Sequence, residues 1–195
     1  MAPIRIEGEI GADVTAGGVA DALAEIGGPA DIVVNSAGGS ATEGAAIFAE
    51  LKAHPAPVTI RVRGIAASAA SLLVMAGDRI LMAPGSVLML HDPAALTLGS
   101  AEVHRSAAAV LEELATIYAG IYAEASGNRA SLVREWMRAE SWIAPEDAVA
   151  LGFADGLEEA PAPAPETAPA PTARAAAPAL AHHPVAAVAA PILTI

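Results

Sequence analysis

Residues 31–63, DIVVNSAGGSATEGAAIFAELKAHPAPVTIRVR, contain one complete strand–helix–strand unit. The apolar runs at 31–35 and 58–63 predict strands, and the Ala-rich segment 42–53 between them predicts a helix. A helix that connects two strands of one sheet leaves those strands parallel. We therefore predict an α/β domain whose sheet is largely parallel.

The same alternation continues on both sides of this unit. Further strands are expected at residues 4–10, 79–82 and 87–91, and further helices at 14–26, 66–76, 101–125, 129–138 and 145–151. The helix at 101–125 is the longest, and apolar residues recur along it at helical spacing. These residues provide more apolar surface than packing on one sheet face needs.

The composition limits the classes of function. The 195 residues suit one domain with an appendage, and a formal net charge of −12 disfavours binding to nucleic acid, whose phosphates repel such a surface. The absence of cysteine excludes disulfides, thiolate zinc sites and a cysteine nucleophile. The opening residues MAPIRIEGEIG do not resemble an export signal, and the most apolar stretch, 65–77, is shorter than the roughly 20 residues that span a bilayer. We expect a cytoplasmic protein without a membrane partner.

The end of the chain differs in composition from the rest. Eight of the fifteen prolines fall in residues 158–195, within an Ala/Pro-rich run. Such a composition cannot build a packed core and favours an extended, solvated chain. We predict a folded domain over residues 1–157 and a disordered tail over 158–195, whose last apolar residues could become ordered on a partner.

Three segments carry residues suited to catalysis. In RGIAASAAS, 63–71, Ser68 lies at a strand-to-helix junction between alanines, and small neighbours leave a nucleophile open to a substrate carbonyl. The Gly-Gly turn of NSAGGS, 35–40, can present backbone N–H groups at the carboxyl end of the sheet. His91 ends an apolar strand. Taken singly, each has a structural explanation: close helix packing for the serines, an ordinary loop for the glycines and a satisfied imidazole for His91.

The other histidines are weaker candidates. His54 lies in a Pro-rich turn, His104 on the long helix, and the adjacent pair His182 and His183 in the tail. Two neighbouring histidines without a carboxylate partner make a weak metal site. The Gly-Gly turn lacks the spacing and the lysine of a phosphate-binding loop. No metal or organic cofactor is therefore expected.

The order of the segments along the chain is more specific than any one of them. NSAGGS, GIAASAAS, MAGDRILMAPGSVLMLHDP and ESWIAPEDAVALGFAD together resemble the ClpP family of serine peptidases, over residues 4–157. With the opening GEIGADVTA, the chain more closely resembles the ClpP-related head maturation proteases encoded by phages and prophages. The resemblance implies a spiral of βα units, as in the crotonase superfamily, with the long helix at 101–125 protruding from it. It also implies assembly into a homo-oligomeric ring through this helix.

The resemblance also implies a mechanism. The nucleophile of the family falls on Ser68, its general base on His91 and the acid of its triad on Glu140. Its oxyanion donors fall on the backbone N–H groups of Gly39 and Ala69. The implied activity is that of a serine endopeptidase that needs no cofactor, cleaves a capsid or scaffold protein and works without an ATPase partner.

Other carboxylates compete with Glu140 for the role of the acid, namely Asp92, Glu146, Asp147 and Asp155. Asp92 directly follows His91 on the expected strand and so points to the opposite face. Glu146 and Asp147 follow a proline at an expected helix start, where acids commonly cap. Glu140 instead precedes a short apolar stretch that can return to the sheet beside His91.

Two functions of other classes stay open. A catalytically silent assembly or scaffold protein would fit the acidic body and the low-complexity tail, and a crotonase-type acyl-CoA enzyme would use paired N–H groups on a related fold. The presence of both Ser68 and His91 favours the peptidase over either. A Ser–Lys dyad is disfavoured because the only lysine, Lys52, lies on the helix before the strand at 58–63. Ser71, one turn after Ser68, is predicted to be dispensable.

Overall fold

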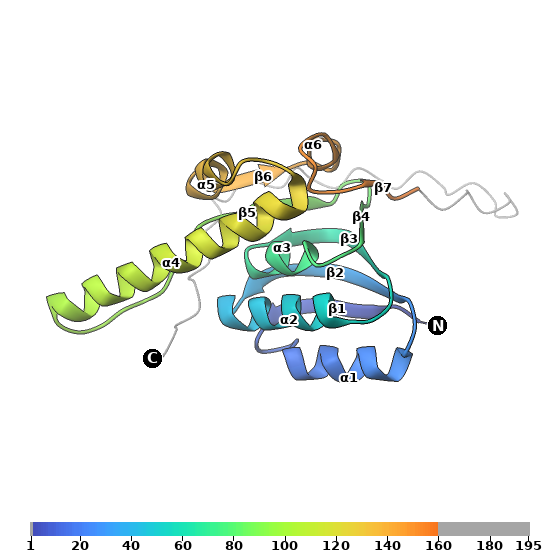
Figure 1. Cartoon of the computed structure of the whole chain (residues 1–195), viewed down its shortest axis with the longest axis horizontal. Helices are drawn as coiled ribbons and strands as arrows, with labels where there is room; N and C mark the ends of the chain where they lie inside the picture. The colour runs from blue at the N-terminus through green and yellow to red at the C-terminus, as the bar shows by residue number, and fades with distance from the viewer. Residues whose placement is uncertain (1, 160–195) are drawn as a thin grey trace, which may run out of the picture.

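The computed structural model describes residues 2–159, which form one mostly parallel sheet with helices between its strands (Figure 1). The elements, in chain order, are β1 (Ile4–Ile10), α1 (Ala16–Ile26), β2 (Ala30–Gly39), α2 (Ala41–Ala53), β3 (Val58–Ala67), α3 (Ala69–Val74), β4 (Arg79–Met82), β5 (Val87–Leu90), α4 (Ala101–Ser126), α5 (Ala130–Arg138), β6 (Ser141–Ile143), α6 (Pro145–Ala150) and β7 (Gly156–Leu157).

The sheet has the largely parallel character that the strand–helix alternation predicted. Its main path runs β1-β2-β3-β4-β7, and every neighbouring pair on this path is parallel. Strand β5 also pairs with β3 in parallel, whereas β6 pairs with β5 in the antiparallel sense. Apolar side chains from the strands and the helices between them form a single core cluster, so the α/β prediction is confirmed.

Strand β3 branches the sheet because its two halves have different neighbours. Residues 59–62 pair with β4, and residues 65–67 pair with β5. Gly64 lies between the halves with φ 118°, and a Cβ there would stand 2.3 Å from Oδ1 of Asn35, so only glycine fits. The branch brings the carboxyl ends of β3 and β5 side by side.

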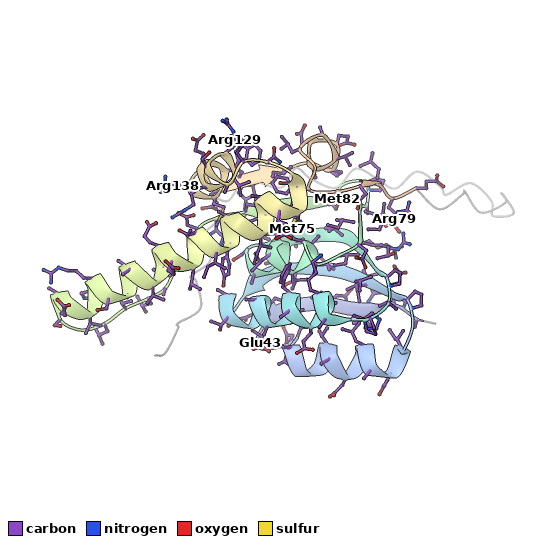
Figure 2. The ribbon with its side chains drawn as sticks, viewed as in Figure 1. Glu43, Met75, Arg79, Met82, Arg129 and Arg138 are labelled. Atoms are coloured by element: carbon purple, nitrogen blue, oxygen red, sulfur yellow. The ribbon has the colours of Figure 1, made fainter. Side chains whose placement is uncertain are left out.

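Side-chain caps determine where the main helices begin. Thr15, Ser40 and Ser100 each accept a hydrogen bond from a backbone N–H in the first turn of α1, α2 and α4. Glu43, labelled on α2 in Figure 2, adds a link between helices. Its Oε1 accepts a hydrogen bond from the backbone N–H of Ala16 at 2.6 Å. The starts of α1 and α2 are therefore held together near the end of β2.

Helix α4 is the predicted long, protruding helix. It has 26 residues and is about 39 Å long, and its first half projects away from the sheet (Figure 1). Its second half packs on the core through Ala115, Tyr118, Ala119 and Tyr122. Three apolar side chains on α4 are about half exposed, namely Val103 at 45%, Val110 at 51% and Ile117 at 48%.

Some element boundaries differ from those predicted. Strand β3 extends to Ala67, whereas the sequence predicts a strand end at 63 and a helix from 66. Alanine has a low strand propensity, but pairing with β5 overrides it at this position. The two-residue strand β7 was not predicted. Within the tail predicted over 158–195, Glu158 is held to the sheet, because its backbone N–H donates to the Met82 carbonyl at 2.7 Å. Residues 160–195 lie outside the described residues. No helix within 2–159 is long and apolar enough to cross a bilayer.

Candidate active site

Ser68 occupies a sharp turn between β3 and α3. Its backbone has φ 56° and ψ −126°, a conformation rarely adopted by a residue with a side chain. Strain of this kind costs about 1–3 kcal/mol and is concentrated at functional sites. Backbone hydrogen bonds hold the turn, because the Ser68 N–H donates to the Met89 carbonyl at 3.1 Å and the Ser68 carbonyl accepts from the N–H groups of Ser71 at 3.0 Å and Leu72 at 3.2 Å.

His91 directly follows β5 and meets Ser68 across the branch of the sheet. Ala67, the last residue of β3, is the register partner of Met89 in β5. Ser68 follows β3 and His91 follows β5, so the two residues lie close together. The His91 Nε2 and Ser68 Oγ atoms are 2.7 Å apart. In the tautomer with its hydrogen on Nδ1, His91 accepts the Ser68 hydroxyl hydrogen, which is the arrangement of a nucleophile and its general base.

The Gly-Gly turn is formed by the last two residues of β2, which continues to Gly39 and pairs there with Glu9 and Ile10 of β1, whereas the sequence predicts a strand end at 35. This turn packs against Ser68. Gly38 has φ 102°, and a Cβ there would lie 2.7 Å from Cβ of Ser68. Gly39 has φ 146°, and a Cβ there would lie 2.2 Å from the Ile10 carbonyl oxygen. Both positions therefore require glycine. The peptide that joins them carries the Gly39 N–H and lies beside the nucleophile.

The backbone N–H groups of Ala69 and Gly38 have different surroundings. Ala69 is the first residue of α3, so its N–H has no acceptor within the helix. The Gly38 N–H donates to Ser36 Oγ at 3.1 Å, and that hydroxyl donates to the Gly8 carbonyl at 2.6 Å. Ser36 is buried and braces the glycine turn. This role was not identified from the sequence, although Ser36 lies inside the NSAGGS motif, which could have pointed to it.

The backbone of Glu140 lies across from that of His91, but the two side chains form no hydrogen bond with each other. Leu90 pairs with Ser141 in the antiparallel β5–β6 ladder, so continuing the register by one residue sets His91 across from Glu140. Glu140 is exposed and has φ 52°, a left-handed conformation that ends α5. Within residues 2–159, no hydrogen bond connects the Glu140 carboxylate to His91.

The rival carboxylates have other partners or positions. Asp92 forms an ion pair with Arg134 of α5, and this hydrogen bond raises the pKa of the guanidinium. Asp155 Oδ2 accepts a hydrogen bond from the backbone N–H of Ile80 at 2.6 Å. Glu146 and Asp147 occupy the first turn of α6, where acids stabilise the positive end of a helix. Each of these placements has a structural explanation.

A small cavity of about 20 Å³ opens beside the Ser68–His91 pair. It is mostly apolar and is lined by Ala41, Ser68, Ala69, Leu72, His91, Pro93, Tyr118 and Tyr122. A volume of this size holds about one water molecule or one methyl group. The two tyrosines come from α4 and were not identified from the sequence, because nothing local predicts that α4 would cover the site.

The remaining candidates lie away from Ser68. His54 Nε2 contacts the Gly28 carbonyl at 2.8 Å, and His104 Nδ1 contacts Thr97 Oγ1 at 2.7 Å. Lys52 lines a separate cavity with Asp78 and Asp155, among others. His182 and His183 lie outside the described residues. In the part of the chain that is described, no group of three or more His, Asp or Glu side chains is arranged to hold a metal ion.

Comparisons with known proteins identify the family of the chain. The family model described as Clp protease matches residues 19–160. Subunit 1 of the proteolytic component of the ATP-dependent Clp protease from Chlamydia muridarum is 30% identical over 140 residues, which are 69% of this chain and 72% of the relative. The ATP-dependent Clp protease proteolytic subunit from Leuconostoc citreum is 29% identical over 129 residues, which are 64% of this chain and 64% of the relative.

The fold also matches a solved structure. A ClpP1 mutant from Listeria monocytogenes superposes with a TM-score of 0.72 over 81% of this chain and 91% of that chain. The two sequences are 23% identical, so this likeness concerns the fold alone. It confirms the ClpP-like α/β architecture that the sequence motifs implied.

Proposed function

Since the chain belongs to the Clp protease family and is a serine-type peptidase, we propose that Ser68, His91 and Glu140 form its catalytic triad. The observation that carries this proposal is the 2.7 Å contact between Ser68 Oγ and His91 Nε2, at the carboxyl ends of two adjacent strands. The strained backbone of Ser68 supports it, because strain of this kind persists where function requires it. The oxyanion donors are the backbone N–H groups of Gly39 and Ala69.

The proposed reaction cleaves a peptide bond in two steps. Ser68 Oγ attacks the carbonyl carbon of the substrate while His91 Nε2 takes the hydroxyl proton. The negative charge that develops on the carbonyl oxygen is stabilised by the N–H groups of Gly39 and Ala69. His91 then gives the proton to the leaving amine, which leaves an acyl group on Ser68. A water molecule, deprotonated by His91, attacks this ester. The bond between the acyl group and Ser68 Oγ then breaks, His91 returns the proton to Ser68 Oγ, and the second product leaves.

Glu140 stabilises the imidazolium that forms during each step. A carboxylate that accepts a hydrogen bond from Nδ1 holds the productive tautomer and offsets the positive charge. The β5–β6 register supports Glu140 in this role, since it sets the two residues opposite each other. Catalytic hydrogen bonds are often unmade without substrate and tighten in the reacting complex. The exposed Glu140 side chain is free to make that movement.

The proposed substrate is a capsid or scaffold protein of a phage or prophage. The chain cleaves it as an endopeptidase in the cytoplasm of the host. The support is the resemblance of residues 8–16, GEIGADVTA, to head maturation proteases. The body, predicted as 1–157 and joined by Glu158 through its bonds to Arg63, performs the chemistry, and the Ala/Pro-rich segment that follows is an appended tail. Family membership and the Ser68–His91 contact disfavour both the acyl-CoA enzyme and the silent scaffold protein.

The proposal is tested by following hydrolysis of an unfolded protein and of a candidate capsid protein by intact mass, without ATP or an ATPase. Wild-type protein should produce internal cleavage products, and Ser68→Ala should produce none while its Tm stays near the wild-type value. Ser86→Ala, which removes the hydroxyl of a buried serine outside the proposed site, serves as the control. Cleavage of the unfolded protein but not of the capsid protein would retain the peptidase and reject the proposed substrate.

A further inference from the structure

Ser71 is fully buried and touches the backbone of the nucleophile. Its Oγ donates a hydrogen bond to the Ser68 carbonyl at 2.7 Å and lies 2.7 Å from the hydroxyl of Tyr122. A serine hydroxyl has one hydrogen, and the Ser68 carbonyl already receives it. The Tyr122 hydroxyl must therefore donate to Ser71 Oγ, which creates a chain of hydrogen bonds from α4 to the backbone of Ser68.

Tyr122 is well suited to anchor this chain. It is 3% exposed, and burial raises the pKa of its phenol, so the hydroxyl keeps the proton that it donates. Its ring contacts Phe153 edge to face, with centroids 6.3 Å apart. Among the described residues no buried side-chain polar atom lacks a partner, so the Tyr122–Ser71–Ser68 chain is complete.

The geometry of the peptide bond connects this chain to the reaction. The carbonyl of Ser68 and the N–H of Ala69 belong to one trans peptide, in which the two groups point in opposite directions. A hydrogen bond that fixes the Ser68 carbonyl on the side of α3 therefore fixes the Ala69 N–H on the other side. The unusual ψ of −126° at Ser68 sets this orientation.

We infer that Ser71 and Tyr122 are positioning residues that orient the Ser68–Ala69 peptide, so that the Ala69 N–H points at the developing oxyanion. The inference rests on the proposed role of Ser68 and Ala69. It replaces the expectation that Ser71 is dispensable. The bonds that the Ser68 carbonyl accepts from the backbone N–H groups of Ser71 and Leu72 are longer, at 3.0 and 3.2 Å, and remain when the Ser71 hydroxyl is removed.

The first test is the kinetics of Ser71→Ala on a peptide substrate. We expect kcat to fall about 10-fold or more, with KM within about twofold of wild type, because the lost interaction acts in the transition state. A peptide boronate, whose tetrahedral adduct on Ser68 places an oxygen at the oxyanion donors, should lose affinity by a similar factor.

The second test separates positioning from stability. Ser71→Ala leaves the buried Tyr122 hydroxyl without its acceptor and should lower Tm. The double variant Ser71→Ala/Tyr122→Phe removes both polar groups and should recover much of the lost Tm, while kcat stays as low as in Ser71→Ala. The control is Ser86→Ala. Ser86 Oγ donates to the Ala83 carbonyl at 2.7 Å, the same local hydrogen bond in a turn away from the nucleophile, and its loss should leave kcat unchanged.

Three outcomes are informative in different ways. If kcat recovers together with Tm in the double variant, Ser71 has only a structural role and the inference is overturned. It is equally overturned if Ser71→Ala turns over within about twofold of wild type. If wild-type protein does not hydrolyse peptides, or if Ser68→Ala still does, the proposed function itself is wrong, and this result is recognised without any Ser71 variant.

Discussion

At the scale of single residues, the Ser68–His91 pair depends on glycine and alanine neighbours whose small size leaves room around it. Gly38 brings its backbone against the nucleophile, and the alanines on both sides of Ser68 keep the turn open. The order of the motifs predicts Ser68, His91 and the Gly-Gly turn from the sequence. Tyr122 could not be predicted, because its contact with Ser71 joins segments that are distant in sequence and have no local pattern. Ser36 lies inside the NSAGGS motif, but its hydrogen bond to the distant Gly8 carbonyl has no local pattern either.

Gly38→Ala tests the close approach of the glycine turn to Ser68. The added Cβ would lie 2.7 Å from both the Ala67 carbonyl oxygen and Ser68 Cβ, at a backbone φ of 102°. We expect turnover to be lost and the free energy of unfolding to fall by about 1–3 kcal/mol. Gly17→Ala is the matched control, since a Cβ on Gly17 meets nothing within 4 Å. Normal turnover by Gly38→Ala would show that the turn does not form part of the site.

Glu140→Gln tests the acid of the proposed triad. The amide keeps the shape of the side chain but cannot stabilise the His91 imidazolium, so kcat should fall by about two to four orders of magnitude. The comparison variants are Asp92→Asn and Asp147→Asn, measured with the same peptide. If Glu140→Gln is nearly as active as wild type and one of the others is not, the acid must be reassigned.

At the scale of elements, the branch of β3 explains how the site is assembled. Predicted elements agree with the structure where a local period is strong, as in β1, α1, α2 and α4. They disagree at β3, which continues through two alanines because β5 pairs with them, and at β7, which is only two residues long. Pairing between distant segments decides both cases, and no local pattern in the sequence contains that information.

Strand β7 is held to the sheet by charges as well as by hydrogen bonds. Glu158, directly after β7, receives hydrogen bonds from Arg63 and Arg61 of β3. The hydrogen bond from Arg63 is the main reason that the pKa of Glu158 is lowered from its ordinary value of 4.5. A lowered pKa means that the ionised carboxylate stabilises the folded state at pH values above 4.5, and that this contribution is lost as the pH falls through the lowered pKa.

Glu158→Gln should therefore lower Tm at neutral pH, and the difference from wild type should shrink as the pH is reduced below 4.5. Thermal unfolding at a series of pH values measures this directly. Glu159→Gln, at the exposed neighbouring position, should show little difference at any pH. A Tm difference for Glu158→Gln that is the same at acidic and neutral pH would contradict the ion-pair explanation.

At the scale of the whole molecule, α4 offers a surface for other copies of the chain. Figure 1 shows its first half standing clear of the sheet, and Val103, Val110 and Ile117 are each about half exposed. Helical spacing predicts this stripe from the sequence, whereas the packing of the second half over Ser71 and Leu72 could be seen only in three dimensions. One helix thus contacts the site at one end and exposes an apolar stripe along its length.

Assembly into rings through α4 is expected to depend on this stripe. Val110→Glu places a charge at its centre and should reduce the mass measured by sedimentation from that of an oligomer toward that of a monomer. Ala24→Glu, an exposed position on α1, should leave the mass unchanged. Wild-type protein that sediments only as a monomer at micromolar concentrations would refute assembly.

The central claim is that Ser68, activated by His91, is the nucleophile. The most direct measurement is to label the folded full-length chain with a fluorophosphonate and to locate the adduct by peptide mapping. We predict one adduct per chain, on Ser68, that is absent in Ser68→Ala and forms far more slowly in His91→Ala. An adduct on Ser71 or another serine, or no adduct on protein shown to be folded, would contradict the account.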